Sequence, residues 1–315
     1  MISIYKTTGG DINPQLVKID APEEGCWINV VSPTEQELIL LSKKAGAPIE
    51  FLRAALDEEE TSRIDFEGSS ALFIVDIPFT EMEDNSLTYD TYPLAVIHTD
   101  NMLISVCLKN SKILTDFIDG KVKTFFTFKR SRFTLQILYR VAIYYLIYLR
   151  QIDKKSVMIQ KKLQISMKNK EVIQLLSLEK SLVYFSTSLK SNEITLEKML
   201  KIDLLEKYPD DKDVLEDVII ENKQAIEMAN IYSNILSGTM DAYASIISNN
   251  LNIVMKFLAS VTIVLSIPTL IYSLYGMNVK NLPFENNPNA FSIILGISVI
   301  ATLIAVFIFN KKDML

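Results

Sequence analysis

The sequence has 315 residues, of which 49% are hydrophobic and 22% are charged, so it belongs to neither a disordered nor a fibrous protein. Two cysteines, Cys26 and Cys107, and a single histidine, His98, exclude a disulfide-rich scaffold, a cysteine-based zinc cluster and a site with several histidines. The net charge of −6, from 32 basic and 38 acidic residues, argues against a general nucleic-acid-binding protein.

The first 128 residues mix strand and helix patterns. WINVVSP predicts a strand, and the next residues predict a helix through about Leu41, with Ser32 as N-cap, Pro33 at the first position and Glu35 at the third. A second helix is predicted around 48–56. The runs ALFIVDIPF, YPLAVIH and MLISVCL predict strands, and a turn over 99–101 separates the last two. We therefore expect a cytoplasmic α/β domain over 1–128.

The rare residues of this domain have ordinary interpretations. His98 lies at the end of a predicted strand, where a structural or surface role is expected rather than a ligand role. Cys26 and Cys107 are expected to be reduced and structural.

From about residue 131 onward, glycine is absent until Gly238, and the chain is rich in Leu, Ile, Lys and Glu. The segment 208–211 predicts a break between helices. After it, apolar or small residues recur with steps of three and four, which is the spacing of a coiled-coil seam: Ala229, Tyr232, Leu236, Met240, Tyr243, Ile247, Leu251, Val254 and Leu258. We expect a helical domain and stalk over 129–252, with one helix continuing into the next segment.

Two uncharged runs, 257–279 and 290–310, are each long enough to cross a bilayer core, which needs about 20 helical residues. A buried core helix is the alternative for any one such run, but two adjacent runs favour a membrane domain over 253–315. A third apolar run, 135–149, contains Arg140 and predicts a buried helix of the soluble part.

The charges flanking these runs predict the topology. Lys256 precedes the first run, and Lys311 and Lys312 follow the second, whereas the loop between them carries only Lys280 and Glu285. The positive-inside bias therefore places both termini in the cytoplasm and the protein in the cytoplasmic membrane. The first residues contain no apolar run of the kind found in a signal peptide.

Four hydroxyl residues of the first run share one helical face, because Thr262, Ser266, Thr269 and Ser273 are spaced by four, three and four. Extending the spacing backwards adds Ala259, Met255 and Asn252. Such a stripe has two interpretations: packing between membrane helices, or the wall of a water-filled lumen. Two spans cannot enclose a lumen, so the second interpretation requires an oligomer. Pro268 lies in the middle of the run and frees a backbone carbonyl.

The first run ends in Tyr275-Gly276-Met277-Asn278. A Tyr-Gly-Met-Asn motif at this place, after a proline-containing span and before a short loop and a second span, resembles the signature of the CorA-type magnesium transport family. WINVVSPTEQE and Asn252–Lys256 are also similar to the family's N-terminal pattern and to its junction between stalk and membrane. The resemblance implies a funnel-shaped homopentamer in the lipid bilayer, with the first span lining the pore.

The resemblance also implies roles for individual residues. Gly276, Met277 and Asn278 would form the outer selectivity filter, and Asp217 would belong to a regulatory magnesium site between subunits. The acidic partner of Asp217 would be Asp65 or Glu67, and Glu285 would lie in the outer loop. The remaining implied residues line the pore: Asn252, Met255, Leu258, Ala259, Thr262, Ser266, Thr269 and Ser273.

The chemistry of the motif suits Mg²⁺, which seeks oxygen ligands and sheds water slowly. An uncharged amide such as that of Asn278 can accept hydrogen bonds from the water of a hydrated ion without binding it too tightly. We therefore expect a channel for Mg²⁺, with Co²⁺ or Ni²⁺ as further substrates, gated by cytosolic Mg²⁺. The alternatives are a transporter of Zn²⁺ or another transition metal, and a membrane-anchored sensor. We expect no enzyme, because the sequence has no phosphate-binding glycine loop and no nucleophile elbow.

Overall fold

The structure is a computed structural model, and it describes residues 1–9, 14–83, 86–122, 124–165, 169–202, 210–279, 282–284, 287–312 and 314. The chain divides into two compact units, Met1–Gly238 and Thr239–Leu315. The three domains predicted from the sequence, with boundaries at 128 and 252, stay a prediction.

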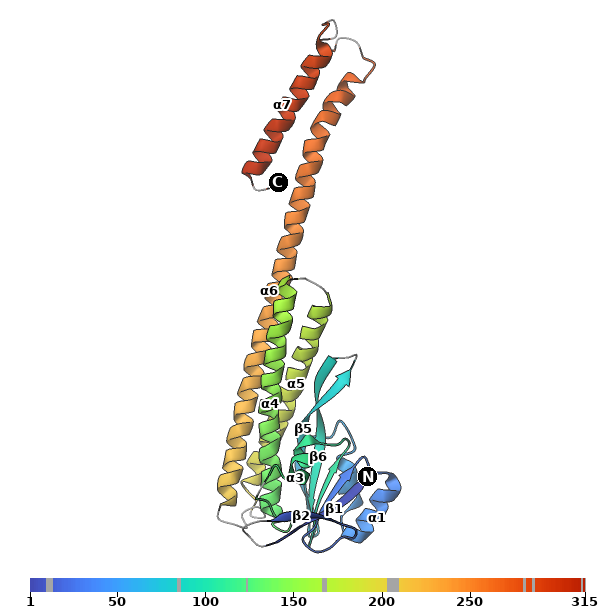
Figure 1. Cartoon of the computed structure of the whole chain (residues 1–315), viewed down its shortest axis with the longest axis vertical. Coiled ribbons are helices and arrows are strands. Elements are labelled where there is room, and N and C mark those ends of the chain that lie inside the picture. Colours follow the sequence, from blue (N-terminus) through green and yellow to red (C-terminus); the bar gives the residue numbers. More distant parts are fainter. Residues whose placement is uncertain are drawn as a thin grey trace. The chain divides into compact units, whose positions relative to one another are not determined.

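A seven-stranded sheet is the centre of the first unit (Figure 1). Its order is β2-β1-β3-β7-β6-β5-β4, and all neighbours are antiparallel except β3 and β7. The strands are β1 Ile2–Thr8, β2 Gln15–Ile19, β3 Trp27–Val31, β4 Arg63–Glu67, β5 Ser70–Glu83, β6 Ser86–His98 and β7 Leu103–Cys107. The four predicted strands are confirmed as β3, β5, β6 and β7, the inner part of the sheet.

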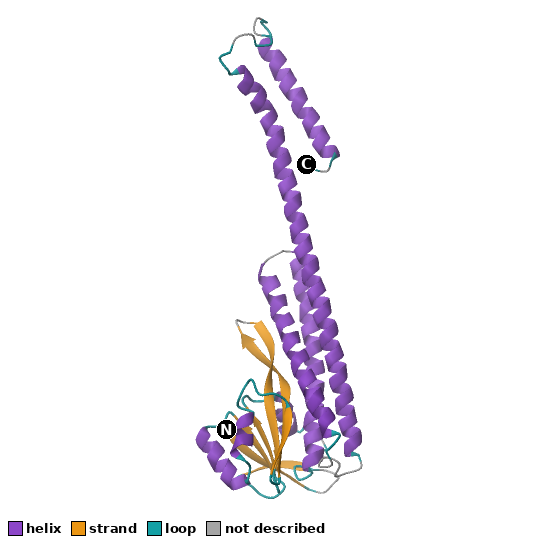
Figure 2. Ribbon diagram, turned by 180° about the vertical axis from the view of Figure 1, so that it is seen from behind, coloured by secondary structure: helices purple, strands orange, loops and turns teal. Residues whose placement is uncertain are grey.

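The part of the chain that the structure describes contains seven helices (Figure 2). They are α1 Glu35–Ala45, α2 Ile49–Ala54, α3 Lys112–Ile118, α4 Arg130–Ile165, α5 Asn169–Met199, α6 Asp211–Tyr275 and α7 Ala290–Lys311. The buried helix predicted over 135–149 is the first half of α4, where Leu135, Ile137 and Leu149 are fully buried.

The predicted N-cap of the first helix is wrong. The N-cap is Thr34, whose hydroxyl accepts from the Glu37 amide at 3.3 Å, while the Glu37 carboxylate accepts from the Thr34 amide at 2.8 Å. This is a capping box displaced by two residues from the predicted one. Ser32 has a φ of 42°, whereas an N-cap residue needs extended backbone, so it cannot begin the helix.

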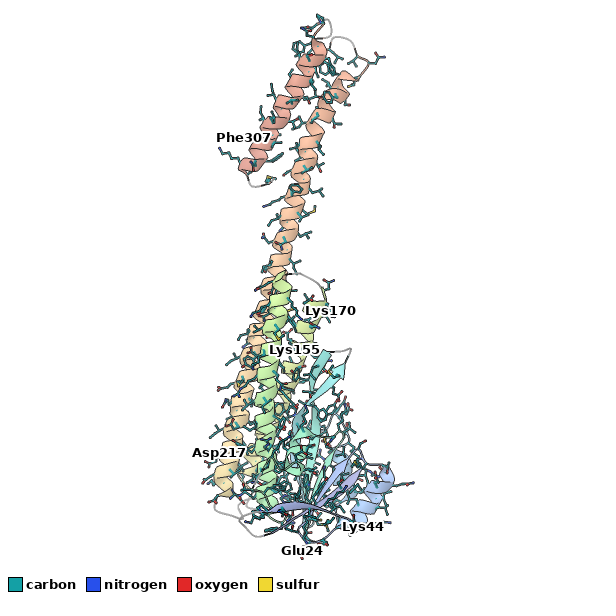
Figure 3. The ribbon with its side chains drawn as sticks, in the orientation of Figure 1. Glu24, Lys44, Lys155, Lys170, Asp217 and Phe307 are labelled. Carbon is teal, nitrogen blue, oxygen red and sulfur yellow. The ribbon has the colours of Figure 1, made fainter. Side chains whose placement is uncertain are left out.

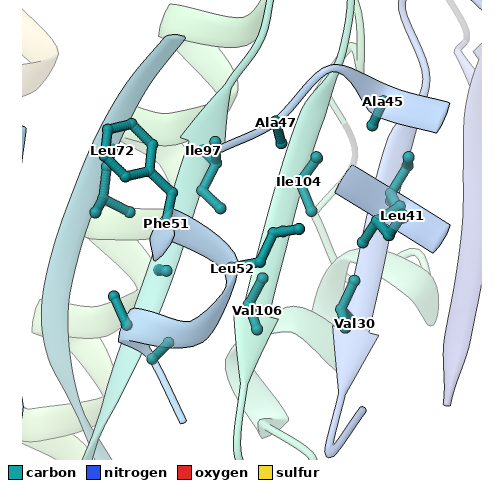
Figure 4. Close-up of a cluster of buried hydrophobic side chains, with 14 of the residues drawn as sticks. Val30, Leu41, Ala45, Ala47, Phe51, Leu52, Leu72, Ile97, Ile104 and Val106 are labelled. Carbon is teal, nitrogen blue, oxygen red and sulfur yellow. The ribbon is translucent and has the colours of Figure 1, made fainter. Parts of the chain in front are cut away.

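The sheet is covered on both faces. On one face, α1 and α2 pack Leu41, Phe51 and Leu52 against alternate strand residues such as Ile104 and Val106 (Figure 4). On the other face, β3 presents Trp27, whose ring meets Phe133 of α4 edge-on at 5.2 Å. Because successive side chains of a strand point to opposite faces, each strand contributes apolar residues to the helices on both sides, as expected for a sheet buried on both faces.

The histidine and cysteine expectations agree with the structure. His98 is 6% exposed, its Nε2 lies 2.7 Å from the hydroxyl of Thr134, and burial lowers its pKa to about 3. Cys26 and Cys107 are free and fully buried. Burial raises the pKa of the Cys107 thiol to about 11, which keeps it protonated.

A polar joint fixes α5 to the sheet beside the first residue of the short strand β4. The amide of Asn192 accepts from the Asp76 backbone N–H at 2.8 Å and donates to the Asp76 carbonyl at 2.8 Å, as a further strand residue would. Ser62 donates to the same Asn192 oxygen at 2.7 Å. On the β6 side Asp76 faces Pro93, which has no N–H to offer. The Asn192 side chain thus completes the sheet edge.

The last helix of the first unit continues without interruption into the second, as predicted, because α6 is a single helix of 65 residues containing Gly238 and Pro268. Within the first unit, Asn222 of α6 donates to the Leu189 carbonyl of α5 at 3.0 Å. The apolar seam is buried there at Ala229 and Leu236. In the second unit the same seam is exposed, beginning with Ile247.

Candidate ion pathway along α6

The polar stripe of α6 lies on the side of the helix that faces away from α7. In the second unit α7 lies beside the last part of α6 (Figures 1 and 2). The least exposed residues of this part recur as Ser260, Val264, Ile267 and Ile271, while the stripe residues are all exposed. Each hydroxyl residue follows one of these positions by two, which is a rotation of about 200° on an α-helix. Packing between α6 and α7 therefore does not explain the stripe.

The hydroxyl groups of the stripe are oriented by their own helix. Thr262 donates to the Leu258 carbonyl at 2.8 Å, Ser266 to Ile263 at 2.8 Å, and Thr269 to Leu265 at 3.0 Å. Since each hydrogen is used within the helix, the oxygen lone pairs are what these residues offer outward. Acceptors of this kind suit the water molecules of a hydrated cation.

A groove of about 660 Å³ follows the stripe on the surface of α6. The side chains that line it are Thr262, Leu265, Ser266, Thr269, Leu270, Ser273, Leu274 and Met277. Every lining residue comes from α6 or the turn after it, so one chain supplies one wall. The three leucines were absent from the predicted set, because they lie on the shoulders of the stripe rather than on its axis.

The outer end of the groove is the C-terminus of α6. The Gly276 amide donates to the Tyr272 carbonyl at 2.9 Å, so the helix ends at the signature motif. Tyr275 ties this end to the following loop through a 3.1 Å bond to the Pro283 carbonyl. Carbonyl groups left unpaired at a helix C-terminus, together with the helix dipole, favour a cation beyond it. Met277 and Asn278 are exposed at this point.

Gly276 is not required by backbone conformation, since its φ is not in the left-handed region. A Cβ at this position would lie 3.4 Å from the carbonyl oxygens of Ser273 and Tyr272, which is ordinary contact. Within one chain an alanine would therefore fit.

The four positions predicted for the inner constriction lie on exposed parts of α6. Met255 is 56% exposed and Leu258 is 57% exposed, and Asn252 and Ala259 are also exposed. The outer-loop residue Glu285 and its neighbour Lys280 lie outside the described residues.

Asp217 lies on the exposed side of α6 in the first unit (Figure 3). It lines a cavity of about 420 Å³ together with Lys121, Gln136 and Arg140. Lys121 and Arg140 both form ion pairs with Asp116, which is 1% exposed. The Lys121 ammonium lies 2.8 Å from the Asp116 carboxylate. Burial raises the pKa of Asp116, but the bonds from Lys121, Tyr144 and Arg140 outweigh it and hold that pKa below its usual range.

The predicted acidic partners of Asp217 do not line the cavity beside it. Asp65 of β4 pairs with Arg63 at 2.6 Å, and Glu67 is exposed at the end of the same strand. Among the described residues, no group of three or more His, Cys, Asp or Glu side chains could hold a metal. The cations near Asp217 were not predictable, because Lys121 and Arg140 are 96 and 77 positions away in the sequence.

Residues 22–312 match the family described as CorA-like Mg²⁺ transporter protein. The chain belongs to this family. The cobalt/magnesium transport protein CorA of Methanocaldococcus jannaschii is 28% identical over 99% of this chain and 98% of its own length. The corresponding protein of Thermotoga maritima is 29% identical over 44% of this chain and 42% of its own. These relatives are named as transport proteins, not as enzymes.

The fold is also that of CorA. The complete structure of the CorA magnesium transporter from Methanocaldococcus jannaschii matches with a TM-score of 0.86 and 25% identity, covering 100% of this chain and 99% of that chain. Full-length CmaX shares the fold with a TM-score of 0.70 and 15% identity, over 98% of this chain and 96% of its own. In the part of the chain that the structure describes, α6 and α7 are both long and apolar enough to cross a bilayer.

Proposed function

We propose that this chain is a subunit of a homopentameric CorA channel that conducts Mg²⁺, and also Co²⁺ or Ni²⁺, across the cytoplasmic membrane. The observation that carries the proposal is the groove along α6, whose hydroxyl oxygens face away from α7. Copies of this wall around one axis would form a wet path lined by acceptors. The identity of the ion is inferred from the CorA relatives, which are named as magnesium or cobalt/magnesium transport proteins.

The exposed apolar seam supports an oligomer. Ile247 is 45% exposed and Leu251 is 62% exposed on the part of α6 that precedes the span. Burial of such side chains against neighbouring copies is favourable by roughly 25 cal/mol per Å² of apolar surface. The same contacts would bring Met255 and Leu258 of all copies together, where an apolar ring can close the path by excluding water.

In the proposed path Gly276, Met277 and Asn278 form the outer filter. Asn278 follows the C-terminus of α6, so its amide oxygen and the last helical carbonyls together meet the entering ion. The absence of a Cβ at Gly276 leaves room for the hydrated ion at the mouth. Both termini lie in the cytoplasm, so this filter faces the outside.

Flux into liposomes that contain only this protein tests the proposal. Wild-type protein should admit Mg²⁺ to an enclosed fluorescent indicator, and Asn278→Ala should abolish most of that uptake. Asn310→Ala is the matched control, because it removes the same amide at the exposed end of α7 and should leave uptake unchanged. Uptake that is equal in the two variants would contradict the filter. Parallel uptake of Co²⁺ and Zn²⁺ gives the ion preference.

We further propose that cytosolic Mg²⁺ closes the channel by binding between subunits at Asp217 and at Asp65 or Glu67 of a neighbour. Residues 1–252 carry 28 basic and 36 acidic residues, so neighbouring bodies repel unless a cation lies between them. Lys121 and Arg140 disfavour a metal inside the cavity beside Asp217, which leaves the outer side of that carboxylate for the ion.

Inhibition of uptake by Mg²⁺ on the cytoplasmic side tests the regulatory site. Asp217→Asn should raise the concentration needed for half inhibition. Glu216→Gln, one position away and also exposed, is the control that removes an equal charge from a different face of α6. An unchanged inhibition curve for Asp217→Asn would remove Asp217 from the mechanism.

A further inference from the structure

The stretch of chain that includes the end of α4 and the start of α5 has a charge opposite to that of the rest of the chain. Residues 154–174, here called the α4–α5 tip, contain six lysines and one glutamate, a net charge of +5. The whole chain carries −6, so the remaining residues carry −11. A surface charge this concentrated attracts an anionic partner.

Apolar side chains lie exposed between these lysines. On α4, Lys154, Met158 and Lys161 follow one another by four and three, so they share a face, and Met158 is 61% exposed. On α5, Lys170 and Ile173 are three apart, and Ile173 is 64% exposed. On both helices of the tip, an exposed apolar side chain, Met158 on α4 and Ile173 on α5, therefore lies close to lysine ammonium groups.

The tip lies at the end of the first unit from which α6 departs. Ser237, next to the last residue of this unit, donates to the carboxylate of Glu179, ten residues after the start of α5. Figure 3 shows Lys170 at this end and Lys44 at the opposite one. Only 18 residues, 239–256, separate the unit from the first span, and as a helix they extend about 27 Å along the chain. The short length of chain between the unit and the span therefore allows the tip to approach the bilayer that holds the span.

We propose that the α4–α5 tip docks on the anionic phospholipid headgroups of the membrane in which the channel lies. Lysine ammonium groups bind lipid phosphates, and apolar side chains between them enter the boundary below the headgroups. An acidic surface of a second copy would match the lysines but would leave Met158 and Ile173 against charged groups. The inference rests on the membrane insertion that the proposed function requires.

A fluorescent probe on Ile173→Cys, in the full chain reconstituted into liposomes, reports the docking. Cys26 and Cys107 are fully buried, so the introduced thiol takes the label. A nitroxide on the lipid headgroup should quench the probe when phosphatidylglycerol is mixed into the phosphatidylcholine bilayer, and much less in phosphatidylcholine alone. High salt should reverse the quenching.

Two matched lysine pairs provide the variants. Lys161→Gln/Lys162→Gln removes two exposed charges from the tip. Each lysine near an anionic surface shifts the docking equilibrium roughly fivefold, so the docked-to-free ratio should fall about 25-fold. Lys43→Gln/Lys44→Gln removes an equally exposed adjacent pair from α1 and should have no effect.

Quenching that is equal in the two bilayers, or that responds equally to the two lysine pairs, would overturn the inference. A probe that the headgroup nitroxide quenches in neither bilayer would also overturn it. Mg²⁺ uptake by the same liposomes separates this result from the proposed function, since uptake without lipid-dependent quenching refutes only the docking.

Discussion

Asp76 gives the first unit a pH-dependent stability that a single substitution should remove. Burial, together with the charge of Glu60, raises the pKa of its carboxyl from 3.8 to about 6, although the nearby hydroxyls of Ser188 and Ser62 act to lower it. The folded state therefore binds the proton more tightly than the unfolded state. The resulting stabilisation is complete below about pH 3.8 and is lost as the pH rises through about 6.

The magnitude follows from the shift. About two pKa units, at 1.36 kcal/mol each, amount to roughly 3 kcal/mol, and the partial exposure of Asp76 reduces this to about 2 kcal/mol. Asp76→Asn keeps an acceptor for the serine hydroxyls and carries no charge at any pH. At about pH 8 the variant should therefore be more stable by about 2 kcal/mol, which raises the midpoint of thermal unfolding by roughly 4–8 °C. At about pH 3, where the Asp76 carboxyl is protonated in both the folded and the unfolded state, the two proteins should unfold together.

Trp27 provides the assay, because it is the only tryptophan and is fully buried in the first unit. Its fluorescence in the detergent-solubilised full chain follows the unfolding of that unit alone. Asp100→Asn is the control, since Asp100 is exposed and its substitution should shift the midpoint at neither pH. A variant at Asp76 that is equally stabilised at both pH values, or destabilised at the higher one, would refute the assignment of the effect to this carboxyl.

Three further substitutions test other parts of the structure. Thr269→Val keeps the shape of the side chain but removes an outward acceptor, so Mg²⁺ uptake by liposomes should fall several-fold while the protein remains folded. Gly276→Ala should leave the unfolding midpoint unchanged, because its Cβ meets only ordinary contacts at 3.4 Å, and should still reduce uptake. Asn192→Leu removes three bonds of 2.7–2.8 Å and leaves a buried N–H of Asp76 unpaired, so tryptophan fluorescence should show a loss of about 3 kcal/mol.

The inner strands and long helices were predictable because their hydrophobic patterns are strong. The outer strands β1, β2 and β4 were not, since their residues are mixed in polarity and only the neighbouring strand gives them a reason to be extended. The helix α3 has seven residues and no clear period. The displaced cap of α1 has a similar cause: Ser32 and Thr34 are both good N-cap residues, and backbone conformation chose between them.

Part of the candidate site was also predictable from the sequence, and part was not. Spacing alone placed Thr262, Ser266, Thr269 and Ser273 on one face, and the groove follows that face. Spacing could not decide between packing and a lumen, because the answer depends on which side of α6 the second span occupies. The burial of Ser260 on the opposite side of α6 shows which side the second span occupies, and this burial exists only in the folded structure.

The exposed apolar seam is stronger evidence for an oligomer than the polar stripe. Thr262, Ser266 and Thr269 bond to carbonyls of their own helix, so a single hairpin could face lipid with these groups satisfied. Ile247 and Leu251 precede Lys256 and the span, where water rather than lipid surrounds the helix, yet both are exposed. Contact with another protein surface would stabilise the seam. In the proposed assembly, because seam and stripe lie on one helix, the contacts that bury the seam would also bring copies of the stripe around a common axis.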